Sequence, residues 1–154
     1  MSVEDANSAG SIHGGTVMKL CDEAAGLAAI RHARQRVVTA AVDRLTFLHP
    51  VHVGEVLTLR ASVNAAWRTS MEVGVRVEAE NPFTGETRHT SSAYLTMVAI
   101  DDQGRARRVP PFAAGSPTAE RREREAQLRR ATRLAEREQI IAEREPAARK
   151  KPRA

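Results

Sequence analysis

Two hydrophobic periods follow one another along the chain. From about residue 15 to residue 34, small and apolar residues recur at helical spacing, and one helix face gathers Val17, Leu20, Cys21, Ala24 and Ala28. Beyond it, apolar and polar residues alternate in four runs, at residues 37–48, 55–67, 71–80 and 86–100. Alternation with a period of two is typical of strands that bury one face. A helix followed by a long antiparallel sheet predicts an α+β domain in which the sheet packs around that helix.

The pattern changes after the last predicted strand. A Val-Pro-Pro sequence closes the domain, so we expect it to span residues 1–112, with a linker at residues 113–117. Residues 118–154 form a tail rich in Arg, Glu and Ala, in which Glu and Arg four residues apart favour a helix. Its apolar stripe is too broken to predict a coiled coil. We expect the basic end of the tail, residues 149–153, to be disordered.

The composition fits one globular domain. Of the 154 residues 42% are hydrophobic and only 3% are aromatic, which predicts a core of Val, Leu, Ile and Ala. The single cysteine, Cys21, cannot form an intrachain disulfide. There is no basic segment followed by an apolar run at the amino terminus, and no apolar run long enough to cross a bilayer. We therefore expect a cytoplasmic protein that does not use a membrane.

The net charge of +5 belongs to the tail. Residues 1–116 contain twelve basic and twelve acidic side chains, whereas residues 117–154 contain twelve basic and seven acidic ones. The high isoelectric point therefore says little about what the folded part binds. The tail itself leaves binding to a nucleic acid or an acidic partner open, although mixed Arg and Glu helices are more often simply solvated.

We expect neither a metal nor a cofactor. The five histidines show no two-ligand helical spacing, and Cys21 has no partner cysteine. The chain has no phosphate-cradling P-loop and no dinucleotide fingerprint. It also lacks a Gly-x-Ser-x-Gly elbow, which argues against a serine hydrolase.

The candidate chemistry lies at the predicted helix and just before it. Asp22 is a carboxylate in mid-helix among small apolar residues, and it either acts as a general base or nucleophile or only reaches solvent at the helix rim. Gly14 and Gly15 precede the helix, where free backbone N–H groups can stabilise an oxyanion, or they only form a tight loop. The Asn7 amide can orient a water or donate to a carbonyl, but an asparagine in a polar loop more often turns the backbone.

Four blocks of sequence carry a family resemblance. They read EDANSAGSIHGGTVMKLCDEAAGLAAIRHA, VVTAAVDRLTFLHPVHVGEVLTLRASV, TSMEVGVRVEAENPFTGE and SSAYLTMVAID, in this order and with few gaps over residues 4–112. Together they resemble the hotdog-fold acyl-CoA thioesterases, in which a long sheet wraps a central helix. Members of that family usually carry an additional strand before the first block, where this chain has three residues.

The resemblance implies a role for each matching residue. Asp22 matches the catalytic acid, Asn7 matches a catalytic asparagine contributed by the opposite subunit, and the Gly14–Gly15 amides match those that face the thioester carbonyl. The stretches that match contacts to CoA are Ala40, Ala41 and Val42, and Thr69, Ser70 and Met71.

The resemblance also implies an assembly. We expect a homodimer whose two hotdog units form a continuous sheet, and possible assembly of dimers into hexamers. The surroundings of Gly26 and Ala29 are then the expected approach surface for the partner subunit. The alternatives are a CoA-binding regulatory hotdog protein without activity, and a binder of nucleic acid or an acidic partner that acts through the tail.

Overall fold

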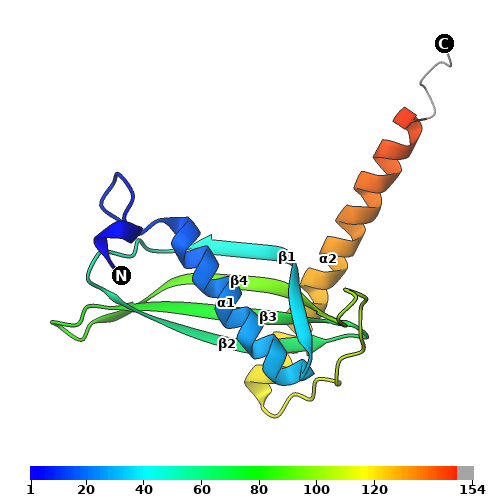
Figure 1. Cartoon of the computed structure of the whole chain (residues 1–154), viewed down its shortest axis with the longest axis horizontal. Coiled ribbons are helices and arrows are strands. Elements are labelled where there is room, and N and C mark those ends of the chain that lie inside the picture. The colour runs from blue at the N-terminus through cyan, green and yellow to red at the C-terminus, as the bar shows by residue number, and fades with distance from the viewer. Residues whose placement is uncertain (149–154) are drawn as a thin grey trace. The chain divides into compact units, whose positions relative to one another are not determined.

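The computed structural model describes residues 1–148, and side chains up to residue 144. It divides the chain into one unit over residues 1–113 and a second unit that begins at residue 114. The first unit contains a short 3-10 helix η1 (Val3–Asp5), helix α1 (Gly14–Ala33) and strands β1 (Arg36–Phe47), β2 (Val56–Ala66), β3 (Ser70–Glu80) and β4 (Thr87–Ile100). The four strands form one antiparallel sheet in the order β1-β4-β3-β2. Helix α1 lies across one face of this sheet (Figure 1), so the predicted α+β class is confirmed.

Helix α1 packs on the sheet through its smallest residues. The side chains that it buries follow one another at intervals of four: Val17, Cys21, Ala25, Ala29 and Ala33. Alanine at three of these positions lets the helix backbone lie close to the sheet. Gly26 also lies near the sheet, because a Cβ there would lie 4.0 Å from Cε of Met97 on β4.

This packing corrects one expectation about the helix. Ala29 has no exposed surface within its own chain, so its side chain is not available as an approach surface for a partner. The exposed apolar side chains of α1 are instead Met18, Leu27 and Ile30. The glycine and alanines of the helix serve contact with its own sheet.

Strand β1 is an edge strand with two irregularities. Its register with β4 shifts between Thr39 and Ala41 and again between Val42 and Arg44, so Ala40 and Asp43 are extra residues relative to β4. The first shift directly follows Thr39, whose partner on β4 is Met97, a core residue beneath α1. The hydroxyl of Thr39 therefore lies on the face of the sheet that carries the helix.

The second unit contains helix α2 (Pro117–Ala148). Its exposed ion pairs include Arg121 with Glu125, at 2.5 Å and an interval of four residues. The helix predicted for the tail is therefore present, whereas the segment predicted to be disordered, residues 149–153, lies outside the described residues. None of the described helices is both long enough and apolar enough to cross a membrane.

Candidate active site

The loop before α1 holds Asn7 in a fixed orientation. Oδ1 of Asn7 accepts hydrogen bonds from the backbone N–H groups of Ala9 (2.9 Å) and Ser11 (3.2 Å), and its own N–H donates to the carbonyl of Ser11 (2.7 Å). Asn7 therefore does turn the backbone. Its oxygen is held by the loop, and its side-chain NH2 group donates to no described side chain or backbone carbonyl, so this group is left as an oriented donor.

Two backbone donors lie beside it at the start of α1. The first intrahelical bonds run from the N–H groups of Thr16 and Val17 to the carbonyl of His13, and the N–H groups of Gly14 and Gly15 have no acceptor in the described part of the chain. A Cβ on Gly14 would lie 3.2 Å from Cζ of Phe47, whereas a Cβ on Gly15 would meet nothing within 4 Å. Gly14 is therefore constrained by packing, and Gly15 faces open space where a ligand oxygen can approach.

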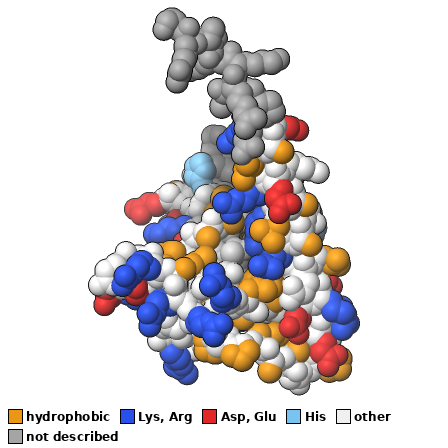
Figure 2. All heavy atoms as spheres, turned by 90° about the vertical axis from the view of Figure 1, so that its right-hand side faces the viewer, with side chains coloured by type: hydrophobic (Ala, Val, Ile, Leu, Met, Phe, Trp, Pro, Cys, Tyr) orange, Lys and Arg blue, Asp and Glu red, His pale blue; other side chains and the backbone are white. Residues whose placement is uncertain are grey.

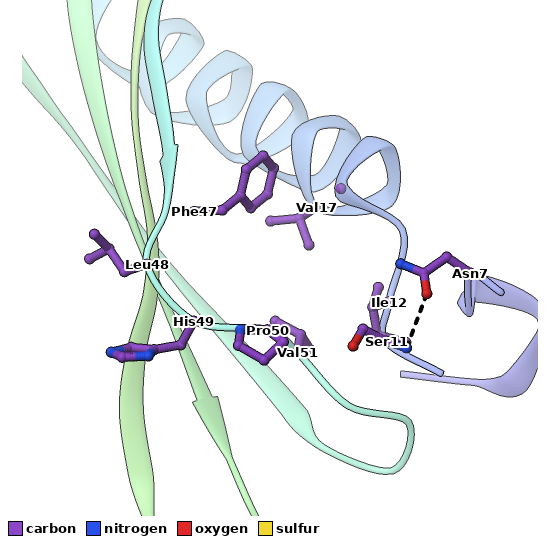
Figure 3. Close-up of a pocket in the computed structure, with 10 residues that line it drawn as sticks. Asn7, Ser11, Ile12, Val17, Phe47, Leu48, His49, Pro50 and Val51 are labelled. Atoms are coloured by element: carbon purple, nitrogen blue, oxygen red, sulfur yellow. Dashed lines mark hydrogen bonds between the residues drawn. The ribbon is translucent and has the colours of Figure 1, made fainter. Parts of the chain in front are cut away.

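Asn7 and Gly14 share one pocket. This open pocket has a volume of about 330 Å³, and its other lining residues are Ser11, Ile12, Val17, Phe47, Leu48, His49, Pro50 and Val51. In Figure 3, Phe47 and Val17 point toward one another between β1 and α1, whereas the side chains of Leu48 and His49 point away from the pocket. The pocket thus joins polar donors at the helix start to a mostly apolar wall.

An ion pair fixes the outer wall of this pocket. Arg88 on β4 binds both carboxylate oxygens of Glu55, at 2.6 and 2.7 Å, and also donates to the carbonyl of Pro50 at 3.0 Å. Val51, in the same loop, accepts a 2.8 Å hydrogen bond from the N–H of Ile12. Glu55 and Arg88 therefore position the Asn7 loop, and this pairing could not be predicted because the two residues are 33 positions apart in the chain.

Asp22 lies on the exposed side of α1 and is held by β1. The hydroxyl of Thr39 donates a 2.5 Å hydrogen bond to Oδ1 of Asp22. Oδ2 has no hydrogen-bond partner among the described residues, and Asp22 as a whole is exposed within one chain. A carboxylate with one oxygen fixed and the other free has the geometry of a general base.

A second, smaller pocket lies beside this carboxylate. It has a volume of about 230 Å³ and is lined mainly by apolar side chains: Met18, Cys21, Val42, Leu45, Ala93 and Leu95, with Lys19 and Asp22. Cys21 does not supply a thiolate there, because burial raises the pKa of its thiol to about 11. The described residues contain no group of three or more His, Cys, Asp or Glu side chains that could hold a metal ion.

One chain does not bring all the predicted site residues together. Gly15 and Asp22 lie on the same side of α1, but seven residues separate them, or about 10 Å along the helix axis. Asn7 and Gly14 line one pocket and Asp22 lines another. A single thioester carbonyl cannot contact both groups within one chain.

The predicted CoA contacts lie on β1 and at the start of β3, two strands that are separated by β4. Ala40, Ala41 and Val42 follow Thr39 on β1, and Val42 is 48% exposed. Thr69 lies in the turn before β3, Ser70 is the first residue of that strand, and Met71 is its first fully buried residue. Met71 belongs to the core and has no exposed surface within one chain, so the structure does not offer it as a contact to CoA there.

The comparisons with known proteins agree with this architecture. Residues 9–85 match the model of the thioesterase superfamily. Protein VdlD of Helicobacter pylori is 41% identical over 97 residues, which are 63% of this chain and 56% of that protein. The chain therefore spans little more than half the length of this curated relative.

Two solved structures extend the likeness to the fold. A hexameric acyl-CoA thioesterase is 38% identical, with a TM-score of 0.85 over 88% of this chain and 87% of that one. The acyl-CoA hydrolase of Staphylococcus aureus, solved with butyryl-CoA, CoA and CoA disulfide, is 32% identical, with a TM-score of 0.86 over 96% of this chain and 90% of that one. The chain belongs to the thioesterase superfamily and has the hotdog fold of its acyl-CoA hydrolases.

The S. aureus hydrolase also offers a comparison of spacing. Its structures include three variants in which an asparagine, an aspartate and a threonine are each replaced by alanine. The aspartate follows the asparagine by 15 residues and the threonine follows the aspartate by 17, which is the spacing of Asn7, Asp22 and Thr39 here. Thr39 was missed from sequence, where the only available signal was a hydroxyl on the core-facing side of a predicted strand.

Proposed function

We propose that this chain hydrolyses acyl-CoA thioesters to a carboxylic acid and free CoA. The observation that carries the proposal is the Asp22 carboxylate, exposed in mid-helix and held at Oδ1 by the Thr39 hydroxyl. The match in spacing with the residues substituted in the S. aureus hydrolase supports it. An exposed carboxylate that only reached solvent would need no such partner on a neighbouring strand.

The chemistry begins at the free oxygen of that carboxylate. Asp22 takes a proton from water, and the resulting hydroxide attacks the thioester carbon. The carbonyl oxygen becomes an oxyanion that accepts hydrogen bonds from the free N–H group of Gly15 or Gly14. When the tetrahedral intermediate collapses, the C–S bond breaks, and Asp22 returns the proton to the CoA thiolate. Direct attack of the carboxylate on the thioester carbon is the less favoured variant.

The site is completed by a second subunit. Gly15 lies about 10 Å along the helix axis from Asp22, and Asn7 and Gly14 line a different pocket from Asp22. We therefore propose that Asn7 and the glycine amides act together with Asp22 of the partner subunit. The surface near Asp22 suits such a contact: Met18 on α1 and Val38 and Val42 on the edge strand β1 are each more than 40% exposed. Two copies of β1 paired along this edge give a homodimer with one continuous sheet and two sites. The hexameric relative supports further assembly into a trimer of dimers.

The test is a hydrolysis assay on purified full-length protein. Wild type is expected to release thiol from at least one of a series of short, medium and long acyl-CoAs. Asp22→Asn keeps the shape of the side chain but removes the base, so kcat should fall by at least about 10²-fold while the dimer and CoA binding persist. Near-wild-type turnover by a dimeric Asp22→Asn protein would exclude Asp22 as the base. A wild type that binds CoA but hydrolyses none of the series would instead be a regulatory hotdog protein.

A further inference from the structure

The segment after β4 crosses the end of the sheet at which α1 finishes. We name this segment, residues 105–110, the strap. The N–H of Arg107 donates to the carbonyl of Ala99 on β4 (2.8 Å), and the N–H of Val109 donates to the carbonyl of Arg68 (3.1 Å). Nε2 of Gln35, just after α1, donates to the carbonyl of Arg108 (2.8 Å). These bonds fix the strap backbone against β4, the turn before β3 and the end of α1.

This end of the sheet carries an excess of positive charge. The two acidic side chains in the neighbouring turn, Asp101 and Asp102, pair with Arg105 (3.0 Å) and Arg36 (3.3 Å). Five further arginines there are exposed and have no ion pair with any described residue: Arg31, Arg34, Arg68, Arg107 and Arg108. The pKa of Asp101 is lowered mainly by the backbone N–H of Arg105 and in small part by the charge of Arg107. Two of the seven arginines named here are therefore paired with a carboxylate, and five are not.

The excess charge borders an open pocket. Its volume is about 580 Å³, and it is lined by Gln35, Ala106, Arg107 and Arg108. Figure 2 views the molecule from the side on which this end of the sheet lies. A guanidinium presents a planar fork of donors that matches a phosphate, and arginines without a carboxylate partner remain free to bind one.

The pocket also lies at a suitable place relative to Asp22. Strand β1 starts at Arg36, beside the pocket, and reaches Thr39, the partner of Asp22, three residues later, about 10 Å along the strand. On the other side, the N–H of Ala99 donates to the carbonyl of Thr69 (3.1 Å), so the strap is one hydrogen-bonded strand away from Thr69 and Ser70. In CoA the pantetheine arm separates the thioester from the phosphates, so a phosphate site is required at a distance from the base rather than beside it.

We infer that the strap pocket binds the phosphate groups of CoA, with Arg107 and Arg108 as the guanidinium ligands. The inference rests on the proposed acyl-CoA hydrolysis and adds a specificity site to it. The hydrogen bonds of the strap hold the backbones of Arg107 and Arg108 in place. The guanidinium groups in the pocket then bind the 3′-phosphate and the pyrophosphate as anions. Recognition here improves substrate binding and does not take part in the chemical step, because no group of the pocket contacts the thioester.

The experiment varies the substrate and the arginines together. KM and kcat are measured for one acyl group carried on CoA, on 3′-dephospho-CoA and on pantetheine, with wild type, Arg107→Gln and Arg108→Gln. Arg60→Gln is the matched control, because it removes one exposed positive charge from β2, where Arg60 pairs with Glu78 at 2.6 Å. For wild type, KM should rise as phosphates are removed. Each strap variant should raise KM for acyl-CoA about tenfold at unchanged kcat and leave KM for acyl-pantetheine unchanged.

Either of two results with the strap variants would overturn the inference. One is that the strap variants match the Arg60→Gln control on acyl-CoA, and the other is that they shift all three substrates alike. Calorimetric titration with CoA and with pantetheine separates this inference from the proposed function. A wild type without hydrolysis that still prefers CoA to pantetheine, and loses the preference in Arg107→Gln, would refute the function and retain the site. Active wild type with equal KM for acyl-CoA and acyl-pantetheine would retain the function and refute the site.

Discussion

The Thr39 hydroxyl on β1 donates a 2.5 Å hydrogen bond to Oδ1 of Asp22 on α1. This bond joins α1 to the edge strand β1, and it sets which carboxylate oxygen remains free. We predict that Thr39→Val lowers kcat by about 10- to 100-fold, because a hydrogen bond to a charged group contributes roughly 1.5–3 kcal/mol. KM should change little, since the binding surfaces remain. Steady-state hydrolysis of one acyl-CoA checks this.

The control is a threonine on the same strand. The hydroxyl of Thr46 has no hydrogen bond to any residue that the structure describes, and Thr46→Val should therefore keep wild-type kcat. If Thr39→Val and Thr46→Val gave equal turnover, Thr39 would have no role in orienting Asp22. If both lost activity together with thermal stability, the effect would belong to the strand rather than to the hydroxyl.

The fold was largely predictable because the hydrophobic residues recur regularly at helical and then at strand intervals. The helix was expected from about residue 15 to residue 34 and occurs at Gly14–Ala33, and the four alternating runs became four strands with bounds shifted by a residue or two. The bulges at Ala40 and Asp43 were not predicted, because an extra residue in a strand only slightly disturbs a two-residue alternation. The side of α1 that packs on the sheet was also placed imperfectly, since alanines on every side of a helix give little contrast.

A candidate site residue could be predicted only where its type is unusual for its position in the sequence. Asp22 stood out because a carboxylate is unusual among small residues in mid-helix, and only the family resemblance led to the expectation that Asn7 takes part. Thr39 did not stand out, because threonine is an ordinary strand residue and its contact with Asp22 depends on how β1 lies against α1. The same applies to Glu55 and Arg88, which meet only when the loop and β4 are folded together.

The two glycines at the start of α1 should respond differently to alanine. A Cβ on Gly14 would lie 3.2 Å from Cζ of Phe47, so Gly14→Ala must displace the ring or the helix start and should lower the melting temperature. A Cβ on Gly15 meets nothing within 4 Å, so Gly15→Ala should leave the melting temperature unchanged or slightly higher.

Activity provides the second measurement on this pair. If the thioester carbonyl approaches the Gly15 N–H, the added methyl group of Gly15→Ala occupies part of that space. We then expect kcat/KM to fall by about tenfold or more in a protein that is as stable as wild type. A Gly15→Ala enzyme with full activity would assign the oxyanion contact to Gly14 or to Asn7 alone.

A site shared between subunits can be tested by mixing two inactive proteins. Asn7→Ala removes the side-chain donor of one half-site and Asp22→Ala removes the base of the other. In a mixed dimer one of the two sites regains both groups, so a statistical mixture should recover roughly a quarter of wild-type activity, since half the dimers are mixed and each has one intact site. Activity is measured after subunit exchange, which a tagged partner verifies.

The control for this mixing is each variant exchanged with itself. Those samples should stay at their own low activity, since no dimer in them carries an intact site. Proven exchange without recovery would show that Asn7 and Asp22 act within one chain or that one of them has no role in the reaction.

The ion pair between Glu55 and Arg88 should make stability depend on pH. Burial raises the pKa of Glu55, but the Arg88 guanidinium and the N–H of His52 together lower it by more, so the pKa lies below its usual value of 4.5. A carboxyl group whose pKa is lower in the folded state adds stability above the unfolded-state pKa, and that stability is lost as pH falls through the folded-state pKa. Wild type should therefore weaken on acidification below about pH 4.5.

Glu55→Gln separates this pair from the other carboxylates. At neutral pH it leaves the Arg88 charge, which is 28% exposed, without its partner, and should lower the free energy of unfolding by about 1–3 kcal/mol. Asp102→Asn, which breaks the exposed pair with Arg36, should cost no more than about 0.5 kcal/mol. Urea unfolding at neutral pH and in steps below pH 4.5 should show the difference between wild type and Glu55→Gln shrinking as Glu55 becomes protonated. A difference that stays constant with pH would mean that Glu55 stabilises the loop through its shape and hydrogen bonds and not through its charge.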